Sequence, residues 1–236
     1  MKRLVLGSGL LGTKIISLTG WKYINRSEDN FNFLESNSYY PLLLKHKPEE
    51  VINCIAYTKT LDDLNSDLHW NTNYVGVIDL VDMCNALDIK LTHISTDYVY
   101  ANSKPHATEE NIPVHYDNWY TYTKLLADAY IQAKCEKYLI LRSSFKPNPF
   151  PHKEAWIDLI GNFDYVDVIA KLMIKVIKKD AIGIYNIGTE LKTIYDMAKE
   201  TNPNVLPIQK DYRFIDSNDI SMDITKMKEL FKKSIS

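Results

Sequence analysis

Short apolar runs alternate with amphipathic stretches along the first 142 residues. Five runs of strand length predict buried strands, and four stretches with apolar residues at helical spacing predict helices. The predicted strands are 3–7, 21–25, 51–57, 89–95 and 138–142, and the predicted helices are 10–18, 39–50, 69–88 and 119–134. Near-continuous apolar strands alternating with helices are typical of a parallel sheet covered on both faces. The pattern therefore predicts an α/β, Rossmann-type doubly wound sheet.

The pattern changes after Arg142. Residues 145–152 carry three prolines and predict an extended loop. Beyond it the pattern predicts three helices and a short strand, at 165–179, 193–200, 223–233 and 183–188. We therefore expect two domains, 1–145 with the sheet and 146–236 as a small C-terminal lobe, some of whose elements return to the sheet.

Composition narrows the class of protein. The chain has 236 residues and a formal net charge of −2, so nothing basic points to nucleic acid. Three cysteines, an odd number without metal-ligand spacing, favour a reducing, cytoplasmic location and no metal site. No apolar run is long enough to span a membrane, and the N-terminal apolar run is too short for a signal peptide.

The first strand ends in a glycine-rich turn, Gly7-Ser8-Gly9-Leu10-Leu11-Gly12. In a G-x-G-x-x-G turn the first glycine allows a tight bend, the second lets backbone approach a pyrophosphate, and the third lets helix and strand pack closely. The N-terminus of the following helix offers free N–H groups to phosphates. The turn predicts a dinucleotide site, so that 1–145 is a dinucleotide-binding domain.

The end of the second strand bears on which dinucleotide binds. Asn25, Arg26 and Ser27 come first there, and the acidic residues Glu28 and Asp29 follow. An acidic residue at this point reads a ribose 2′-hydroxyl, whereas an arginine can pair with a 2′-phosphate. The order favours NADP(H) over NAD(H), with Asn25, Arg26 and Ser27 as contacts; the alternative is that Arg26 is a solvated loop residue.

Tyr120 and Lys124 lie four residues apart, on one face of a predicted helix. A nearby ammonium lowers the pKa of a phenol, which can then protonate an oxygen formed by hydride addition. The spacing alone is weak evidence, because Tyr-x-x-x-Lys also begins at Tyr100, Tyr130 and Tyr195. Only Tyr120 begins a helix expected at the carboxyl ends of the strands, where open α/β sheets bind ligands.

The strand at 89–95 delivers Thr96 and Asp97 to its carboxyl end. Beside Tyr120 and Lys124, the Thr96 hydroxyl could donate a hydrogen bond to a substrate carbonyl. The alternative is that Thr96 and Asp97 are helix-cap or turn residues. We expect Thr96, Tyr120 and Lys124 to be catalytic.

With these residues assembled, the chain resembles the extended short-chain dehydrogenase/reductase superfamily, and within it the dTDP-4-dehydrorhamnose reductase family. The resemblance rests on VINCIAYT (51–58), NTNYVG (71–76), HISTDYVY (93–100), YTYTKLLAD (120–128), LILRSSF (139–145) and GIYNIG (183–188). It implies an oxidoreductase of carbohydrate biosynthesis, specifically dTDP-rhamnose biosynthesis, that transfers hydride from NADPH or NADH to the C4 ketone of a nucleotide-linked 4-keto-6-deoxy sugar.

The resemblance also implies particular contacts. Besides the turn, it implies that the cofactor contacts Ala56, Tyr57, Thr58, Asn73, Ser95, Tyr120 and Lys124. Substrate contacts would be Thr96, Asp97, Tyr98 and Phe145, which stands where the family has tryptophan; Arg213 is a hypothetical contact to a diphosphate. The glycine turn is one residue shorter than the family's usual turn. Nucleotide-sugar dehydratases carry Thr-Asp-Glu where this chain has Thr96-Asp97-Tyr98, which argues against dehydration.

Two other functions stay open at this point. One is an NADP-binding regulatory subunit without turnover, because such a subunit of methionine adenosyltransferase resembles the same superfamily. The other is a nucleotide-sugar epimerase, alone or combined with reduction, which needs an additional base such as His152. We expect a nucleotide-sugar partner, no nucleic acid and no membrane, and a homodimer is left open.

Overall fold

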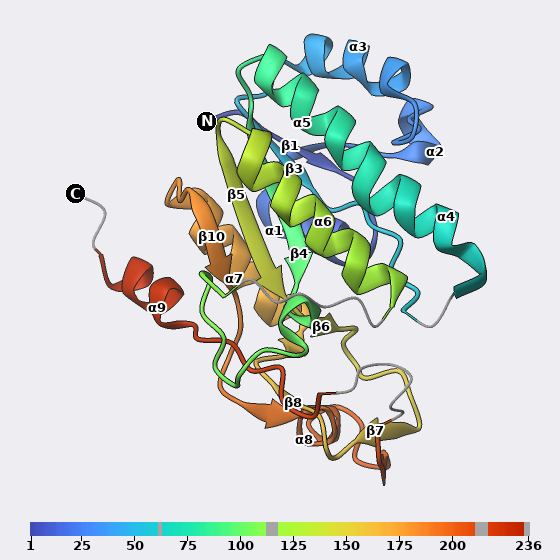
Figure 1. Ribbon diagram of the computed structural model, residues 1–236, viewed down its shortest axis with the longest axis vertical. Coiled ribbons are helices and arrows are strands. Elements are labelled where there is room, and N and C mark those ends of the chain that lie inside the picture. Colours follow the sequence, from blue (N-terminus) through green and yellow to red (C-terminus); the bar gives the residue numbers. More distant parts are fainter. Residues whose placement is uncertain (61–62, 112–117, 211–216, 234–236) are drawn as a thin grey trace. The chain divides into compact units, whose positions relative to one another are not determined.

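A computed structural model describes all residues except 61–62, 112–117, 211–216 and 234–236. The chain forms two compact units, each built from two segments (Figure 1). The first unit is Met1–Ser95 with Asn118–Ile140, and the second is Thr96–Asp117 with Leu141–Ser236. No helix within the described ranges is long and apolar enough to cross a membrane. The boundary predicted at residue 145 stays a prediction.

The central sheet has six strands in the order β10-β5-β4-β3-β1-β2. The first unit holds β1 to β4 and the start of β5, with bounds Arg3–Leu6, Lys22–Ile24, Glu50–Asn53, Lys90–Thr96 and Tyr138–Ser143. Strand β1 pairs in parallel with β2 and β3, and β3 pairs in parallel with β4. Their side chains are buried almost throughout, because helices cover both faces. The predicted Rossmann-type fold is confirmed.

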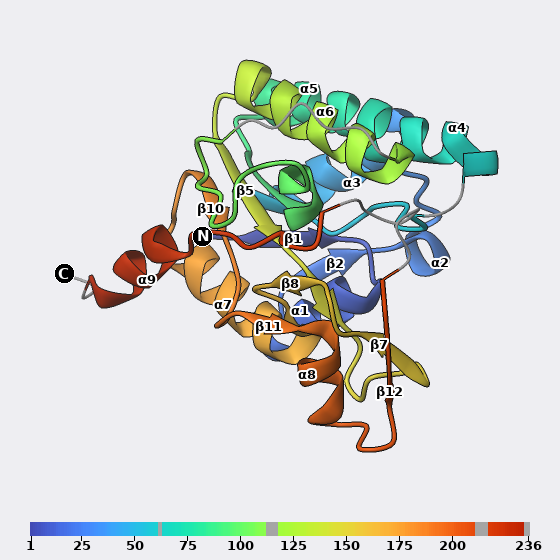
Figure 2. The same cartoon turned by 60° about the horizontal axis from the view of Figure 1, so that its bottom comes forward.

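The helices of the first unit connect successive parallel strands. Figure 2 shows α3, α5 and α6 on one face of the strands and α1 on the other. The bounds are α1 Leu10–Thr19, α2 Arg26–Asp29, α3 Ser36–His46, α4 Ser66–His69, α5 Gly76–Ala86 and α6 Trp119–Lys134, with a 3-10 turn at Asp63–Asn65. Helix α6 begins where its sequence predicts, because the Asn118 side chain accepts a hydrogen bond from the Thr121 N–H at 2.8 Å.

Three elements of the first unit differ from the prediction by more than two residues. Strand β3 ends at Asn53, four residues early, because its Asn53 side chain turns the chain by accepting from the Ile55 N–H at 3.0 Å. The helix predicted over 69–88 contains a π-helical turn at Trp70–Val75. Helix α3 begins at Ser36 and holds Pro41 within it. Local periodicity does not register such backbone adjustments.

The second unit is built from shorter elements. Its helices are α7 Val166–Lys178, α8 Ile194–Lys199 and α9 Thr225–Lys232, and a 3-10 turn covers Asp97–Tyr100. Its strands are β6 Phe145–Lys146, β7 Glu154–Trp156, β8 Ile160–Gly161, β9 Asp164–Tyr165, β10 Gly183–Asn186, β11 Lys192–Thr193 and β12 Leu206–Ile208. Apart from β10, these strands form two-stranded pairs: β6 with β9, β7 with β12 and β8 with β11.

Candidate functional site

The glycine turn adopts the shape that its sequence predicts. Gly7 has φ of +89°, in the region that favours glycine, and its N–H donates to the Ile24 carbonyl at 3.0 Å. A Cβ on Gly12 would lie 2.1 Å from the Gly7 carbonyl oxygen, so no larger residue fits between turn and helix. A Cβ on Gly9 would meet nothing within 4 Å. The turn therefore packs closely against the helix at Gly12 and leaves open space at Gly9.

A pocket of about 250 Å³ opens at this turn, beside the N-terminus of α1. Its lining residues come from the turn, from the end of β2 and from the segment after β3; they are Gly7, Ser8, Gly9, Asn25, Arg26, Phe31, Phe33, Cys54, Ile55 and Ala56. No side chain caps α1, so its first N–H groups are available to an anion. The pocket thus offers a phosphate-binding end and an apolar wall.

The polar residues that follow β2 have different roles. Asn25 is buried and caps α2, accepting hydrogen bonds from the Glu28 N–H and the Ser27 hydroxyl, each at 2.9 Å. Asp29 accepts from the Asn25 N–H at 2.9 Å, and Glu28 accepts from the Tyr23 hydroxyl at 2.9 Å. Both acidic residues are therefore engaged in holding this turn, while Arg26 is exposed and lines the pocket.

Lys124 is 1% exposed, although it is a lysine. Its Nζ lies 2.8 Å from His93 Nε2 and 2.7 Å from the Ile94 carbonyl oxygen. Burial lowers the pKa of Lys124 to about 8, and the nearby Asp128 and Cys54 act in the opposite direction. A lysine with such a pKa can exchange a proton near neutral pH.

His93 is also completely buried, and it joins Lys124 to Asn53. Its Nδ1 lies 3.3 Å from Asn53 Nδ2, while Asn53 Oδ1 accepts from the Ile55 N–H. Burial, and then the charge of Lys124, lower the pKa of His93 well below its usual value, so this imidazole is neutral.

A second buried asparagine–histidine pair lies beside Tyr120. Asn73 holds the Tyr57 backbone with two hydrogen bonds, accepting from its N–H at 2.8 Å and donating to its carbonyl at 3.0 Å. Asn73 also lies 3.4 Å from Nδ1 of His69, whose Nε2 lies 3.0 Å from the Lys59 carbonyl oxygen. The His69 ring packs edge-on against Tyr57 and Tyr120, with centroid distances of 4.7 and 6.3 Å. The hydrogen bonds hold the His69 ring in place beside the ring of Tyr120, which is half-buried.

Thr96 is the last residue of β4, and in the second unit it begins a 3-10 turn. Its hydroxyl accepts from the Tyr98 N–H at 3.2 Å and donates to Asp97 Oδ1 at 3.3 Å, so it caps this turn. Asp97 and Tyr98 are buried. Burial raises the pKa of Asp97 to about 7, against the opposing charge of Lys146. Thr96 is therefore a cap residue of this turn, and the catalytic role predicted for it stays a prediction.

The second unit has a larger pocket of its own, of about 490 Å³. It is lined by residues of the proline-rich loop and of three nearby elements: Lys146, Phe150, His152, Lys153, Glu154, Ala155, Trp156, Ile194 and Ile208. Two lysines and a histidine outnumber one glutamate, and Phe150 and Trp156 supply flat apolar surface. Such a lining suits an aromatic ring joined to a negatively charged group.

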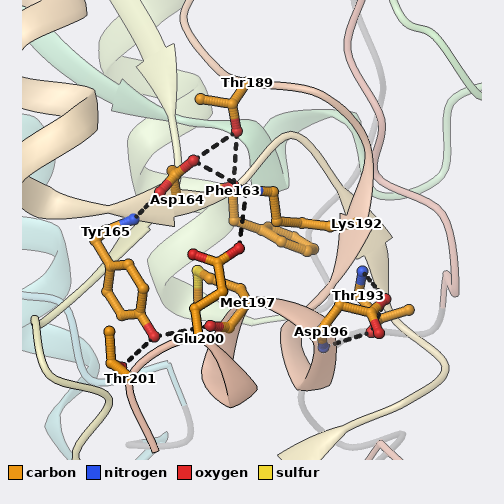
Figure 3. A network of polar contacts seen from close by, with 10 residues as sticks. All are labelled: Phe163, Asp164, Tyr165, Thr189, Lys192, Thr193, Asp196, Met197, Glu200 and Thr201. Carbon is orange, nitrogen blue, oxygen red and sulfur yellow. Dashed lines mark hydrogen bonds and ion pairs between the residues drawn. The ribbon is translucent and has the colours of Figure 1, made fainter.

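A polar network in the same unit joins β9, β11 and α8 (Figure 3). Asp164 accepts hydrogen bonds from Lys192 Nζ at 3.0 Å, from the Thr189 hydroxyl at 2.8 Å and from the Tyr165 N–H at 2.7 Å. The Tyr165 hydroxyl donates to the Met197 carbonyl at 2.8 Å. The contacts made by Lys192, by Thr189 and by the Tyr165 hydroxyl join segments that are distant in sequence, so we assign the network to stability.

The pocket of the first unit brings together six of the predicted cofactor contacts, namely Gly7, Ser8, Gly9, Asn25, Arg26 and Ala56. The other predicted contacts do not line it: Leu10, Leu11, Gly12, Ser27, Tyr57, Thr58, Asn73, Ser95, Tyr120 and Lys124. Ser95 has a buried hydroxyl that pairs with no group in the described part of the chain. Phe145 is half-buried in β6, and Arg213 lies outside the described residues.

Four residues of the first unit were missed by the sequence reasoning. Phe31 and Phe33 form the apolar wall of the pocket, and His69 and His93 hold Tyr120 and Lys124. The alternating aromatic residues directly after Asp29-Asn30 were a usable signal for the wall. No local pattern marks the histidines, because their partners are distant in sequence.

Known proteins resemble this chain in sequence. A family model, the RmlD substrate binding domain, matches residues 1–145. Human dTDP-D-glucose 4,6-dehydratase is 27% identical over 208 residues, which cover 74% of this chain and 59% of that protein. The dTDP-4-dehydrorhamnose reductase of Mycolicibacterium smegmatis is 36% identical over 99 residues, 38% of this chain and 28% of that enzyme. The chain thus spans less than two thirds of either relative.

A solved structure supports the same fold. The crystal structure of dTDP-4-dehydrorhamnose reductase from Bacillus anthracis, in complex with NADP, matches with a TM-score of 0.82 at 20% identity, covering 97% of this chain and 92% of that one. The doubly wound sheet is therefore shared with that protein. Because the family model spans more than half of the sequence, from residue 1 to residue 145, this chain belongs to the RmlD substrate binding domain family.

Proposed function

We propose that the chain is an NADPH-dependent reductase of a nucleotide-linked 4-keto-6-deoxy sugar. One observation carries the proposal: a single compact unit holds a glycine-turn pocket with Arg26 on its wall and a buried Lys124 one helical turn from Tyr120. The first feature suits a dinucleotide, and the second suits transfer of a proton beside it. Membership in the family and the likeness to a reductase that binds NADP support the same reading.

The pocket fits the phosphate-bearing part of a nicotinamide dinucleotide. The turn and the first N–H groups of α1 would hold the pyrophosphate. Arg26 would pair with a ribose 2′-phosphate, because Glu28 and Asp29 are engaged in hydrogen bonds that hold the α2 turn. This division of roles supports a preference for NADP(H) over NAD(H). When bound, the nicotinamide supplies the hydride.

The chain's own residues would handle the proton and the orientation of the substrate. Tyr120 would donate its phenolic proton to the substrate oxygen as the ketone is reduced to an alcohol. Protonated Lys124 would stabilise the phenolate that Tyr120 becomes. Thr96, at the carboxyl end of β4, would donate a hydrogen bond to the same carbonyl by turning its hydroxyl proton away from Asp97 Oδ1. Tyr98 stands where dehydratases carry a second acid, which favours reduction over dehydration.

The nucleotide of the substrate would bind in the pocket of the second unit. Phe150 and Trp156 offer surfaces for a base, and Lys146 and Lys153 offer cations for a diphosphate. Trp156 is the one tryptophan in this unit's sequence, so its fluorescence should respond when UDP or dTDP binds. A cytoplasmic location and a homodimer stay predictions, which fractionation and sedimentation would test.

The deciding experiment follows NADPH absorbance with the full chain and either a UDP- or a dTDP-linked 4-keto-6-deoxy sugar. We expect NADPH oxidation, with one C4 alcohol formed for each NADPH consumed. Tight NADP binding without NADPH oxidation in the presence of either sugar would instead favour a regulatory subunit. A changed sugar without net NADPH oxidation would favour epimerase or dehydratase chemistry, and either result would overturn the proposal.

A further inference from the structure

The contacts around Lys124 contain information about its charge, because every hydrogen bond needs one donor and one acceptor. Three buried side chains form a hydrogen-bonded series: Asn53 at the end of β3, His93 in β4 and Lys124 in α6. All three are at most 1% exposed, so water does not complete their hydrogen bonds. The direction of each bond can therefore be followed from one end to the other.

The hydrogen-bonded series starts at a group that can only be a donor. The Ile55 backbone N–H can only donate, and it lies 3.0 Å from Asn53 Oδ1. The Asn53 amide is thereby oriented, and its Nδ2 faces His93 Nδ1 at 3.3 Å. An amide nitrogen also only donates, so Nδ1 of His93 must accept and carries no proton.

The orientation of Asn53 then determines the other side of the imidazole ring. A neutral imidazole with an unprotonated Nδ1 carries its proton on Nε2. Nε2 lies 2.8 Å from Lys124 Nζ, so the imidazole donates and the lysine must accept. An ammonium has no lone pair, whereas a neutral amine has one and can still donate to the Ile94 carbonyl at 2.7 Å.

The alternative arrangements each leave two donors facing each other. If Lys124 is an ammonium, His93 accepts at Nε2 and its Nδ1–H points at the Asn53 NH₂ group. Rotating the Asn53 amide moves the conflict to the Ile55 N–H. Only the neutral amine satisfies all four groups at once, and buried polar groups are seldom left unpaired.

We propose that His93 is a positioning residue that holds Lys124 as a neutral amine in the cofactor-free protein, with Asn53 fixing the imidazole tautomer. Other groups near Lys124 act against this state: Asp128, one turn further along α6, and Cys54, after β3, both favour the ammonium. Burial acts in the same direction as His93. Its role in turnover rests on the proposed function: Lys124 must take up a proton before it can stabilise a Tyr120 phenolate.

Nuclear magnetic resonance on the full chain tests the proposal without cofactor or substrate. Lysine labelled with ¹³C at Cε reports the charge of each amine, and Lys124→Met identifies the Lys124 signal. Long-range ¹H–¹⁵N spectra report imidazole tautomers, and His93→Gln identifies the His93 signals. We expect Lys124 to titrate well below the exposed lysines, and His93 to carry its proton on Nε2 once Lys124 is neutral.

Asn53→Asp supplies the sharpest comparison. One carboxylate oxygen can still accept from the Ile55 N–H. The other oxygen replaces the amide nitrogen that donates to His93 Nδ1, and it can only accept, so His93 must carry its proton on Nδ1. His93 Nε2 then accepts from an ammonium, so the titration midpoint of Lys124 should rise by at least about one pH unit. Asn85→Asp adds the same charge at a surface site bonded to the Lys134 carbonyl, and should leave the midpoint unchanged.

His93→Gln serves if Asn53→Asp does not fold. The glutamine amide can rotate to accept from an ammonium, so the Lys124 midpoint should again rise. The proposal is overturned if wild-type Lys124 titrates with the other lysines, or if His93 carries its proton on Nδ1 above the Lys124 midpoint. It is also overturned if neither substitution moves the midpoint. None of these outcomes depends on turnover, so they are separate from a failure of the proposed reaction.

Discussion

Lys192 in the second unit is half-buried and Lys124 in the first unit is buried, and the two lysines have different partners. Lys192 in the second unit lies 3.0 Å from an Asp164 carboxylate oxygen, and Asp164 accepts two further hydrogen bonds. Lys124 in the first unit has no carboxylate within ion-pair distance among the residues described, and contacts an imidazole and a carbonyl instead. A buried ammonium is normally paired with an opposite charge, because desolvation disfavours it otherwise. The comparison separates a lysine that holds the fold from one whose proton can move.

The largest expected effect concerns Tyr120, which shares a helix face with Lys124. Tyr120→Phe removes the proposed proton donor and should lower kcat by about 10²–10⁴-fold, with little change in NADP binding. Tyr130→Phe is the matched control, because Tyr130 also precedes a lysine by four positions on α6 but donates to Asp82 at 3.4 Å. Equal kcat values for the two variants would remove Tyr120 from its role.

The next effect tests the stabilising role assigned to Lys192 and Asp164. Asp164→Ala leaves Lys192, Thr189 and the Tyr165 N–H without their common acceptor, so the free energy of unfolding should fall by about 3 kcal/mol. Urea denaturation followed by far-ultraviolet circular dichroism measures it. Asp196→Ala, which removes only the exposed cap of α8, should cost about 1 kcal/mol. A loss at Asp164 no larger than at Asp196 would contradict the assignment.

Local sequence was sufficient for one part of the site. The glycine turn is a backbone feature, so residues 7–12 determine it themselves, and Tyr120 and Lys124 share a helix face by spacing alone. The order of strands and helices follows from periodicity for the same reason. These features depend on neighbours along the chain, and the turn and the helix are confirmed, while the roles of these residues stay predictions.

Other parts depend on contacts between distant segments. His93 faces Lys124 across 31 positions and Asn53 across 40, so no spacing rule links them. The pocket of the second unit combines a proline-rich loop with Ile194 and Ile208, which only the folded chain brings together. Asp164 and Lys192 meet for the same reason. Sequence reasoning can name the residues, but tertiary pairing decides their environment.

The pH dependence of stability sharpens the comparison further. The folded-state pKa of Lys124 is about 8, below the ordinary value of about 10.4, so the unfolded chain binds more protons between these values. Stability should therefore rise with pH in this range, by at most about 1.4 kcal/mol per pH unit relative to Lys124→Met. Denaturation of both proteins at several pH values measures the difference. Turnover should fall over the same range, because the ammonium is lost; a stability difference that does not vary with pH would contradict the assignment.

The smallest expected effect concerns Arg26, an exposed cation that, unlike Lys192, forms no ion pair with the residues the structure describes. Arg26→Ala should weaken NADP binding by about tenfold and leave NAD binding nearly unchanged, because only NADP carries the 2′-phosphate that the guanidinium would contact. Isothermal titration with each cofactor measures both affinities. Lys14→Ala removes a half-buried cation of the same unit that does not line the pocket, and should change neither affinity. Equal losses of affinity for NADP and NAD would show that Arg26 contacts a group that the two cofactors share. Arg26 would then not explain a preference for NADP.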